Sequence, residues 1–446
     1  MGRFLVILLA GTWTAFAQTS APSQQSVPPA GQPEVITLDE VIHRAQTSDV
    51  NYAAAVAAGK TAALDRGIAT ANLLPNVRYF NQGLYTEPLR PYSKTPSPTE
   101  PAPIYIANNG VREYISQAVV NETIGLAGVA TARRAQFLAA QAAAEQEIAR
   151  RGLVGAVVSL FYGSLAADHK LTVAQRARQE AADFTKLTQQ REQAREGARA
   201  DVVKAQLEDQ ARTRELQDAE VAAEKARLDL GVLLYPDPRT PYTLSAPEEA
   251  APLATRDDIN AAAAKNNPDL RSALAALSAS KSGVLAARAA YLPDIGLNYI
   301  YGIDAPQFAK YGPDGTKNLG YAAVVTVDIP VWDWFNTQRR VKQSEIQRQN
   351  AQVVLTATQR QLIARLDEAY SEAVAARDQL ASLDLSVSSA AESLRLTKLA
   401  YTGGESTVLE VVTAQGAYIT AQNAREDGRV RYEAALANLQ TLTGTM

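Results

Sequence analysis

Apolar residues recur at alternating steps of three and four along two stretches in the C-terminal third of the chain. The first stretch carries Leu366, Ala369, Ala373, Ala376, Leu380, Leu383, Val387, Ala390, Leu394 and Tyr401. The second carries Val411, Ala414, Tyr418, Ala421, Gly428, Tyr432, Ala435, Leu439 and Leu442, and only Arg425 interrupts it. This spacing predicts helices packed as a coiled coil. Small side chains let helix axes approach closely. The small residues that we expect at helix–helix contacts are Ala369, Ala373, Ala376, Ala390, Ala414 and Ala421.

Four proline-free segments are long enough to form rods. They are residues 127–194 and 198–234 in the first half of the chain, and residues 338–401 and 407–442 in the second. At about 1.5 Å per residue, the longest of these helices would extend about 100 Å. The sequence therefore predicts two long helical hairpins rather than a globular core.

Between the helices the apolar period changes from seven residues to two. Ile295, Leu297, Tyr299 and Tyr301 alternate with smaller or polar residues. Period-two runs of about ten residues have the length of a tilted strand that crosses an outer membrane. Residues 77–87 and 111–123 occupy the equivalent places in the first half, with weaker alternation. The side chains that we expect to face lipid are Ile295, Leu297, Tyr299, Tyr301, Tyr321, Val325 and Val327.

The two halves of the chain repeat one design. Residues 37–81 align with residues 255–299 without a gap, and each copy ends its first helix with Leu-Pro. A repeat must be recognised early because it decides the architecture. Each half should contain a shorter helix (residues 38–73 and 256–291), two strands and a long helical hairpin. The predicted divisions are a first repeat at 36–235, a linker at 236–254 and a second repeat at 255–444.

The N-terminus has the pattern of an export signal. Arg3 precedes an apolar run that is too short to span a bilayer, and a small-residue site ends at Ala17. We therefore expect a cleavable signal at residues 1–17, followed by a disordered lead-in at 18–35 that is rich in Pro, Ser and Gln. Beyond this signal the sequence predicts no transmembrane helix.

Strand number and composition constrain the assembly and its location. A closed membrane barrel needs at least about eight strands, whereas this chain predicts four, so several copies would have to share one barrel. The formal net charge is −3 over 446 residues, which implies no bulk attraction to nucleic acid. There is no cysteine, and 46% of the residues are apolar, which is typical of a bacterial envelope protein.

Three motifs carry a resemblance to a known family. They are Tyr401-Thr-Gly-Gly404 with Val408-Leu-Glu410-Val411, its counterpart Gly197-Ala-Arg-Ala-Asp201, and the segment Asp328-Ile-Pro330-Val331-Trp332. With the order of elements, these motifs make residues 36–444 resemble the TolC-type outer-membrane efflux proteins. The absence of cysteine matches the branch of that family that carries no lipid.

The resemblance implies a mainly α fold with membrane β structure. Three chains would form a twelve-stranded β-barrel in the outer membrane of a Gram-negative envelope, continued by a long α-helical coiled-coil barrel in the periplasm. Such channels are passive exit ducts of tripartite efflux or type I secretion systems. Their partners are a periplasmic adaptor protein and an inner-membrane transporter.

The resemblance also implies two groups of site residues. Asp201 and Glu410 fall on acidic positions of the periplasmic aperture, and Gly197, Gly403 and Gly404 fall in the turns that dock on the adaptor. The family often has Val-Gly-Leu in these turns, but here only the glycines are kept. Crowded carboxylates in a ring would have raised pKa values. A second interpretation stays open, in which Asp201 and Glu410 stabilise the starts of two helices.

No motif of catalysis or cofactor binding occurs in the sequence. The two histidines, His43 and His169, are far apart and have no neighbouring acidic pair, so we expect no metal site. No phosphate-binding glycine loop or nucleophile elbow is found. The sequence therefore predicts a protein that is not an enzyme and uses no cofactor. The alternative to an exit duct is a structural coiled-coil periplasmic adaptor or scaffold protein.

Overall fold

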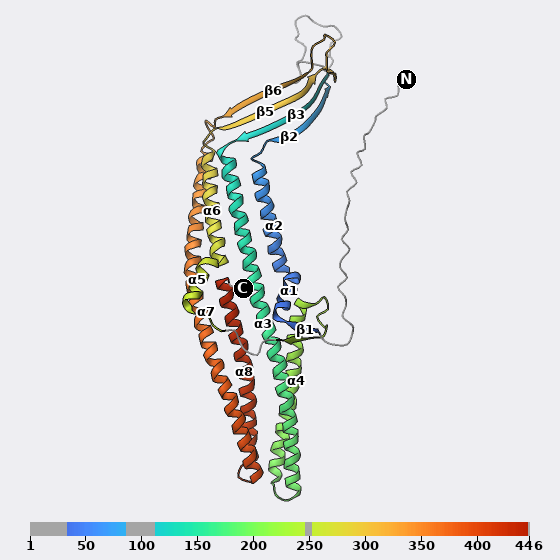
Figure 1. The fold of residues 1–446 in the computed structure, drawn as a ribbon, viewed down its shortest axis with the longest axis vertical. Coiled ribbons are helices and arrows are strands. Elements are labelled where there is room, and N and C mark those ends of the chain that lie inside the picture. Colours follow the sequence, from blue (N-terminus) through green and yellow to red (C-terminus); the bar gives the residue numbers. More distant parts are fainter. Residues whose placement is uncertain (1–33, 86–111, 246–251, 445–446) are drawn as a thin grey trace, which may run out of the picture.

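The protein forms a long helical rod that ends in an arched β-sheet (Figure 1). This architecture is seen in a computed structural model, which describes residues 34–85, 112–245 and 252–444. The expected signal at residues 1–17, most of the lead-in and the loop at residues 88–110 lie outside the described residues.

Four long helices form the lower part of the rod, as the sequence predicted. They are α3 (Leu126–Gln193), α4 (Arg199–Leu234), α7 (Asn336–Gly403) and α8 (Val408–Thr443). The pairs α3/α4 and α7/α8 are antiparallel hairpins, and they lie side by side with α3 against α8. One stretch of α3 is long and apolar enough to cross a membrane by length and composition, although the sequence predicted no such helix. Its packing against α2, α4, α6 and α8 accounts for that apolar character.

The coiled-coil seam lies within the chain, between α7 and α8. Ala369, Ala373 and Ala376 are buried against α8, and Tyr401 packs with Val408 and Val411 at the start of α8. A β-carbon on Gly428 would lie 2.6 Å from Leu383 Cδ1, so the glycine leaves room for the Leu383 side chain between the two helices. The expected helix–helix contacts of these three alanines are therefore confirmed, and the partner helix belongs to the same hairpin.

The two shorter helices are each broken once, which corrects the prediction of single helices at 38–73 and 256–291. The first is divided into α1 (Leu38–Ser48) and α2 (Val50–Ala71), and the second into α5 (Arg256–Asn266) and α6 (Pro268–Ala289). At each break an N-cap side chain accepts a backbone hydrogen bond. Asp49 accepts from the N–H of Tyr52 at 2.6 Å, and Asn267 accepts from the N–H of Leu270 at 2.9 Å. These caps start a new helix at the same place in both repeats.

The arched sheet has four antiparallel strands. They are β2 (Asn76–Tyr85), β3 (Arg112–Ile124), β5 (Asp294–Ala305) and β6 (Leu319–Asp328), in the spatial order β2-β3-β5-β6. The four predicted strands are thus present, two from each repeat. Among the described residues, the outer edges of β2 and β6 have no strand partner.

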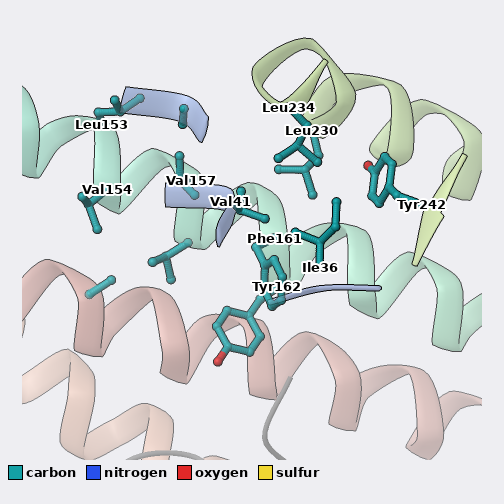
Figure 2. Packing of buried hydrophobic residues seen from close by; sticks show 13 residues of the cluster. Ile36, Val41, Leu153, Val154, Val157, Phe161, Tyr162, Leu230, Leu234 and Tyr242 are labelled. Carbon is teal, nitrogen blue, oxygen red and sulfur yellow. The ribbon is translucent and has the colours of Figure 1, made fainter. Parts of the chain in front are cut away.

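A second, small sheet was not predicted. The strands β1 (Glu34–Thr37) and β4 (Tyr242–Ser245) pair in parallel, so the expected lead-in ends in a strand and the linker contributes one. Ile36 and Val41 pack with Phe161 and Leu230 in the largest apolar cluster (Figure 2). Arg44 bonds Glu34 at 2.7 Å and thereby lowers the pKa of that carboxyl. This contact joins β1 to α1, and the apolar cluster attaches both elements to the middle of the rod.

Candidate membrane barrel and periplasmic tips

The strand register places the seven predicted lipid-facing residues on one face of the sheet, here called the apolar face. Cross-strand partners on this face include Leu297 with Val325, and Tyr301 with Tyr321. The rings of Tyr299 and Tyr321 stack with their centroids 6.3 Å apart. All seven side chains are exposed in the single chain. On β5 and β6 this face thus presents a layer of aliphatic and tyrosine side chains to its surroundings.

The opposite face of the sheet, here called the polar face, carries amides and hydroxyls. Asn76, Asn121 and Asn298 are cross-strand neighbours in one row across β2, β3 and β5. The next row toward the loops contains Arg78, beside Val119 and Ile300. The contrast between the two faces is typical of a membrane strand with lipid on one side and water on the other.

Polar groups on the apolar face are few, and three of them are hydrogen-bonded to one another. The Ser116 hydroxyl lies 2.7 Å from the Tyr79 hydroxyl and donates to Asn81 Oδ1 at 2.7 Å. Glu122 also lies on this face, as the cross-strand partner of Leu297. It is two residues from the end of β3, where a charge costs less than at the centre of a membrane.

An aromatic cluster follows β6 at the junction with α7. The Trp332 ring lies 5.9 Å from that of Trp334 and 5.2 Å from that of Phe335. Trp334 and Phe335 have left-handed backbones, with φ of 58° and 62°. The Asp333 carboxylate accepts from the Thr337 N–H at 2.7 Å, a bond that starts α7 and lowers the pKa of this carboxyl. The sequence identified this segment only as a family motif and did not predict the cluster.

The three candidate docking glycines lie at the two hairpin tips, which share one end of the rod (Figure 1). Gly404 ends α7 with a φ of 81°, a conformation that glycine adopts without strain. Neither Gly197 nor Gly403 has a positive φ; in the first tip Arg195 takes the left-handed conformation, with a φ of 63°. The backbone therefore requires glycine at only one of the three positions.

Asp201 and Glu410 occupy the same position in the two tips, the third residue of a helix. Glu410 forms a capping box with Thr407: its carboxylate accepts from the Thr407 N–H at 2.7 Å, and its own N–H donates to the Thr407 hydroxyl. Asp201 lies 3.5 Å from the Lys204 ammonium. Hydrogen bonds from Ser406 and then Thr407 lower the pKa of Glu410. These donors belong to the start of its own helix, within one chain; the raised pKa expected for carboxylates crowded in a ring of several chains stays a prediction.

The two hairpin tips are connected by contacts that the sequence did not reveal. Arg191 on α3 donates to the backbone carbonyl of Tyr401 on α7 at 2.9 Å, and its guanidinium lies 4.9 Å from the centroid of the Tyr401 ring. Phe184 packs edge-on against the same ring at 5.2 Å. Lys398 pairs with Glu180 at 2.6 Å across the same boundary. Apolar and charged contacts therefore hold the tips side by side.

His169 has an acidic partner, contrary to the expectation from its sequence neighbours. Its Nδ1 lies 3.0 Å from Glu426 Oε2, across the contact between α3 and α8. Arg425, the residue that interrupts the predicted seam, bonds Asp384 and Glu426. Together these contacts lower the pKa of Glu426 despite its burial. Within the described residues no group of three or more histidine or acidic side chains could hold a metal ion.

Comparison with known proteins shows similarity in sequence for the second repeat and in fold for nearly the whole chain. Residues 260–445 match the family model described as outer membrane efflux protein. No curated protein matches the chain in sequence. The structure is similar to the outer membrane protein VceC of Vibrio cholerae, with a TM-score of 0.75, 17% identity, and coverage of 91% of this chain and 96% of that one.

Two further channels share this fold. The Campylobacter jejuni CmeC outer membrane channel has a TM-score of 0.74 at 16% identity, covering 91% of this chain and 85% of that one. The open state of the Neisseria gonorrhoeae MtrE outer membrane channel has a TM-score of 0.74 at 18% identity, covering 91% and 88%. The second repeat thus matches the outer membrane efflux protein family in sequence, and nearly the whole chain has the fold of outer membrane channels; these similarities support a place in the outer membrane with the helical rod extending into the periplasm.

Proposed function

We propose that the protein is the outer-membrane exit duct of a tripartite efflux or type I secretion system, and that it works as a homotrimer. The observation that carries this proposal is the sheet at the end of the rod, with one apolar face and two edges that no described strand covers. Unpaired strand edges cannot face lipid, because their N–H and C=O groups would lack partners. Three copies of a four-stranded sheet would close a twelve-stranded barrel without edges.

The barrel would have its apolar face toward lipid and its polar face around a water-filled lumen. Tyr301 and Tyr321 lie near the loop end of the strands and Trp332 near the rod end, which suits the aromatic belts at both membrane–water interfaces. The α3/α4 and α7/α8 hairpins of three chains would continue the lumen as a helical tunnel across the periplasm. The duct itself is passive, and the energy for export comes from an inner-membrane transporter.

The tips would form the periplasmic mouth. Gly197, Gly403 and Gly404 lie where a periplasmic adaptor could reach the rod, and Asp201 and Glu410 would line the aperture. Threefold symmetry would bring several copies of these acidic groups around one opening, where carboxylates attract cations. Their position at helix starts is compatible with this role, since a carboxylate can serve the helix and the lumen together. No catalytic step is assigned to the chain.

The alternative is a structural coiled-coil adaptor or scaffold in the periplasm. In such a protein the apolar face of the sheet would have to be covered by a soluble domain. In the described part of the chain nothing covers Tyr321 or Val325, which are 75% and 68% exposed. A patch of this kind on a single chain indicates a surface that is buried in another environment. The exposed sheet therefore favours the duct.

Fractionation and assembly test the proposed duct. The full chain, expressed with its own N-terminus in a Gram-negative host, should sediment with outer membranes and require detergent for extraction. It should migrate as a trimer on unheated gels and as a monomer after boiling. A chain that is released by osmotic shock and remains monomeric without detergent would favour the periplasmic alternative.

A further inference from the structure

The middle of the polar face contains a single charged side chain, Arg78. In the register of the sheet, Arg78 on β2 is level with Val119 on β3 and with Ile300 on β5. The adjacent row toward the rod is the asparagine row of Asn76, Asn121 and Asn298. The guanidinium therefore lies beside a band of amides on the polar face.

Arg78 is exposed, and within the described ranges its guanidinium has no hydrogen-bond or ion-pair partner. In the neighbouring row, Asn298 Oδ1 is buried and also lacks a partner among the described residues. A guanidinium presents five N–H donors in a planar fork that suits carboxylates and phosphates. An unpaired arginine beside amide side chains is thus a recognition surface with unused donors, rather than part of an internal salt bridge.

The acidic residues of the polar face lie at the ends of the strands. Asp294 and Asp328 are cross-strand partners at the rod end, and Glu113 and Asp304 lie toward the loop end. Each residue along a strand adds about 3.4 Å, which places the nearest of these carboxylates about 14 Å and the farthest about 20 Å from the Arg78 row. The Debye length at physiological salt is about 8 Å, so salt screens most of the attraction between these carboxylates and Arg78.

We propose that Arg78 forms, with its symmetry copies, a cationic ring at mid-barrel that selects organic anions carrying carboxylate groups. This inference rests on the proposed trimeric duct, in which the polar face lines the lumen. The three copies would place three guanidinium groups around one axis, each next to a row of asparagines. Cation-attracting carboxylates at the periplasmic mouth and an anion-attracting ring in the barrel would then act on a passing molecule in sequence.

Planar-bilayer recording of the purified full-length protein tests the ring, with citrate added on the barrel side as a tricarboxylate probe. Arg78→Gln removes the charge, whereas Arg78→Lys keeps it without the planar fork. Lys310→Gln is the matched control, because it removes the same charge from the loop between β5 and β6, outside the strands. Trimer bands on unheated gels verify that each variant is assembled before it is recorded.

Citrate should reduce the wild-type conductance, and Arg78→Gln should raise the citrate concentration for half-block by about tenfold or more, as expected for the loss of charge-assisted hydrogen bonds. Arg78→Lys should show an intermediate block, and Lys310→Gln should behave as wild type. If wild-type channels conduct and citrate blocks them no more strongly than Arg78→Gln channels, the ring is overturned and the proposed duct is not. Wild-type protein that forms no channels would instead overturn the proposed duct.

Discussion

Val325 and Val324 are adjacent residues on opposite faces of β6, and a charge should disrupt trimer assembly at Val325 but not at Val324. Val325 is level with Leu297 on the apolar face, and Val324 is level with Asn298 on the polar face. Both are exposed in the single chain, at 68% and 47%. Val325→Arg would place a guanidinium in lipid, whereas Val324→Arg would place it in the water of the lumen.

The position of Val325 in the strand sets the size of the effect. It lies three residues from Asp328, the last residue of β6. With about 3.4 Å per residue and a strand tilt of about 40°, this distance corresponds to about 8 Å along the membrane normal. Arginine costs about 2–4 kcal/mol at the midplane and about 0–1 kcal/mol at the interfaces, so we expect about 1–3 kcal/mol per chain. Three copies in one trimer raise this to about 3–9 kcal/mol.

The assay is the fraction of protein that migrates as a heat-dissociable trimer in outer-membrane preparations, with equal expression of both variants. Val325→Arg should lose most of this fraction, and Val324→Arg should retain it. Equal trimer yields for the two variants, or a lower yield for Val324→Arg, would show that the faces are assigned incorrectly.

Three other outcomes are expected. Ala373→Phe should overpack the contact between α7 and α8, cost about 1–3 kcal/mol and lower the melting temperature. The control Ala375→Phe, on the exposed side of α7, should leave the melting temperature unchanged, and equal melting temperatures for the two variants would contradict the seam. Hydrogen bonds from Arg150 and Arg151 lower the pKa of Glu147 to about 2, so its contribution to stability is full above its ordinary pKa of 4.5 and is lost as pH falls through 2. Glu147→Gln should therefore reduce the melting temperature at pH 7 and change it much less at pH 2; an equal reduction at both pH values would contradict this reasoning. Asp201→Asn combined with Glu410→Gln should reduce the cation preference of single channels, and unchanged selectivity would leave only the helix-start role.

Most of the fold could be predicted because it depends on periodicity. The heptad seam and the period-two strands each repeat over many residues, and the observed long helices differ from the predicted ones by no more than two residues at either end. The breaks at Asp49 and Asn267 were missed because an alanine-rich stretch gives no strong signal of its own. Yet both residues are N-cap formers at equivalent places in the repeat, and Pro268 follows one of them, which is the signal that could have located the breaks.

The contacts at the tips could not be predicted, because they join residues that are far apart in sequence. Arg191 and Tyr401 belong to different repeats, and no local pattern indicates that an arginine on one hairpin bonds a carbonyl on the other. The same is true of His169 and Glu426. By contrast, the residues of the apolar face were predicted together, since alternation along one strand fixes which side chains share a face.

The two open edges of the sheet also have a genetic consequence. A chain that can complete its sheet only with neighbouring copies will incorporate whichever copies are present. If a variant and the wild-type chain are made in equal amounts and mix freely, about one trimer in eight contains no variant chain. A substitution that spoils the barrel should therefore be dominant when both genes are expressed. A substitution that unfolds the chain before it can pair should be recessive, because it never enters the shared assembly.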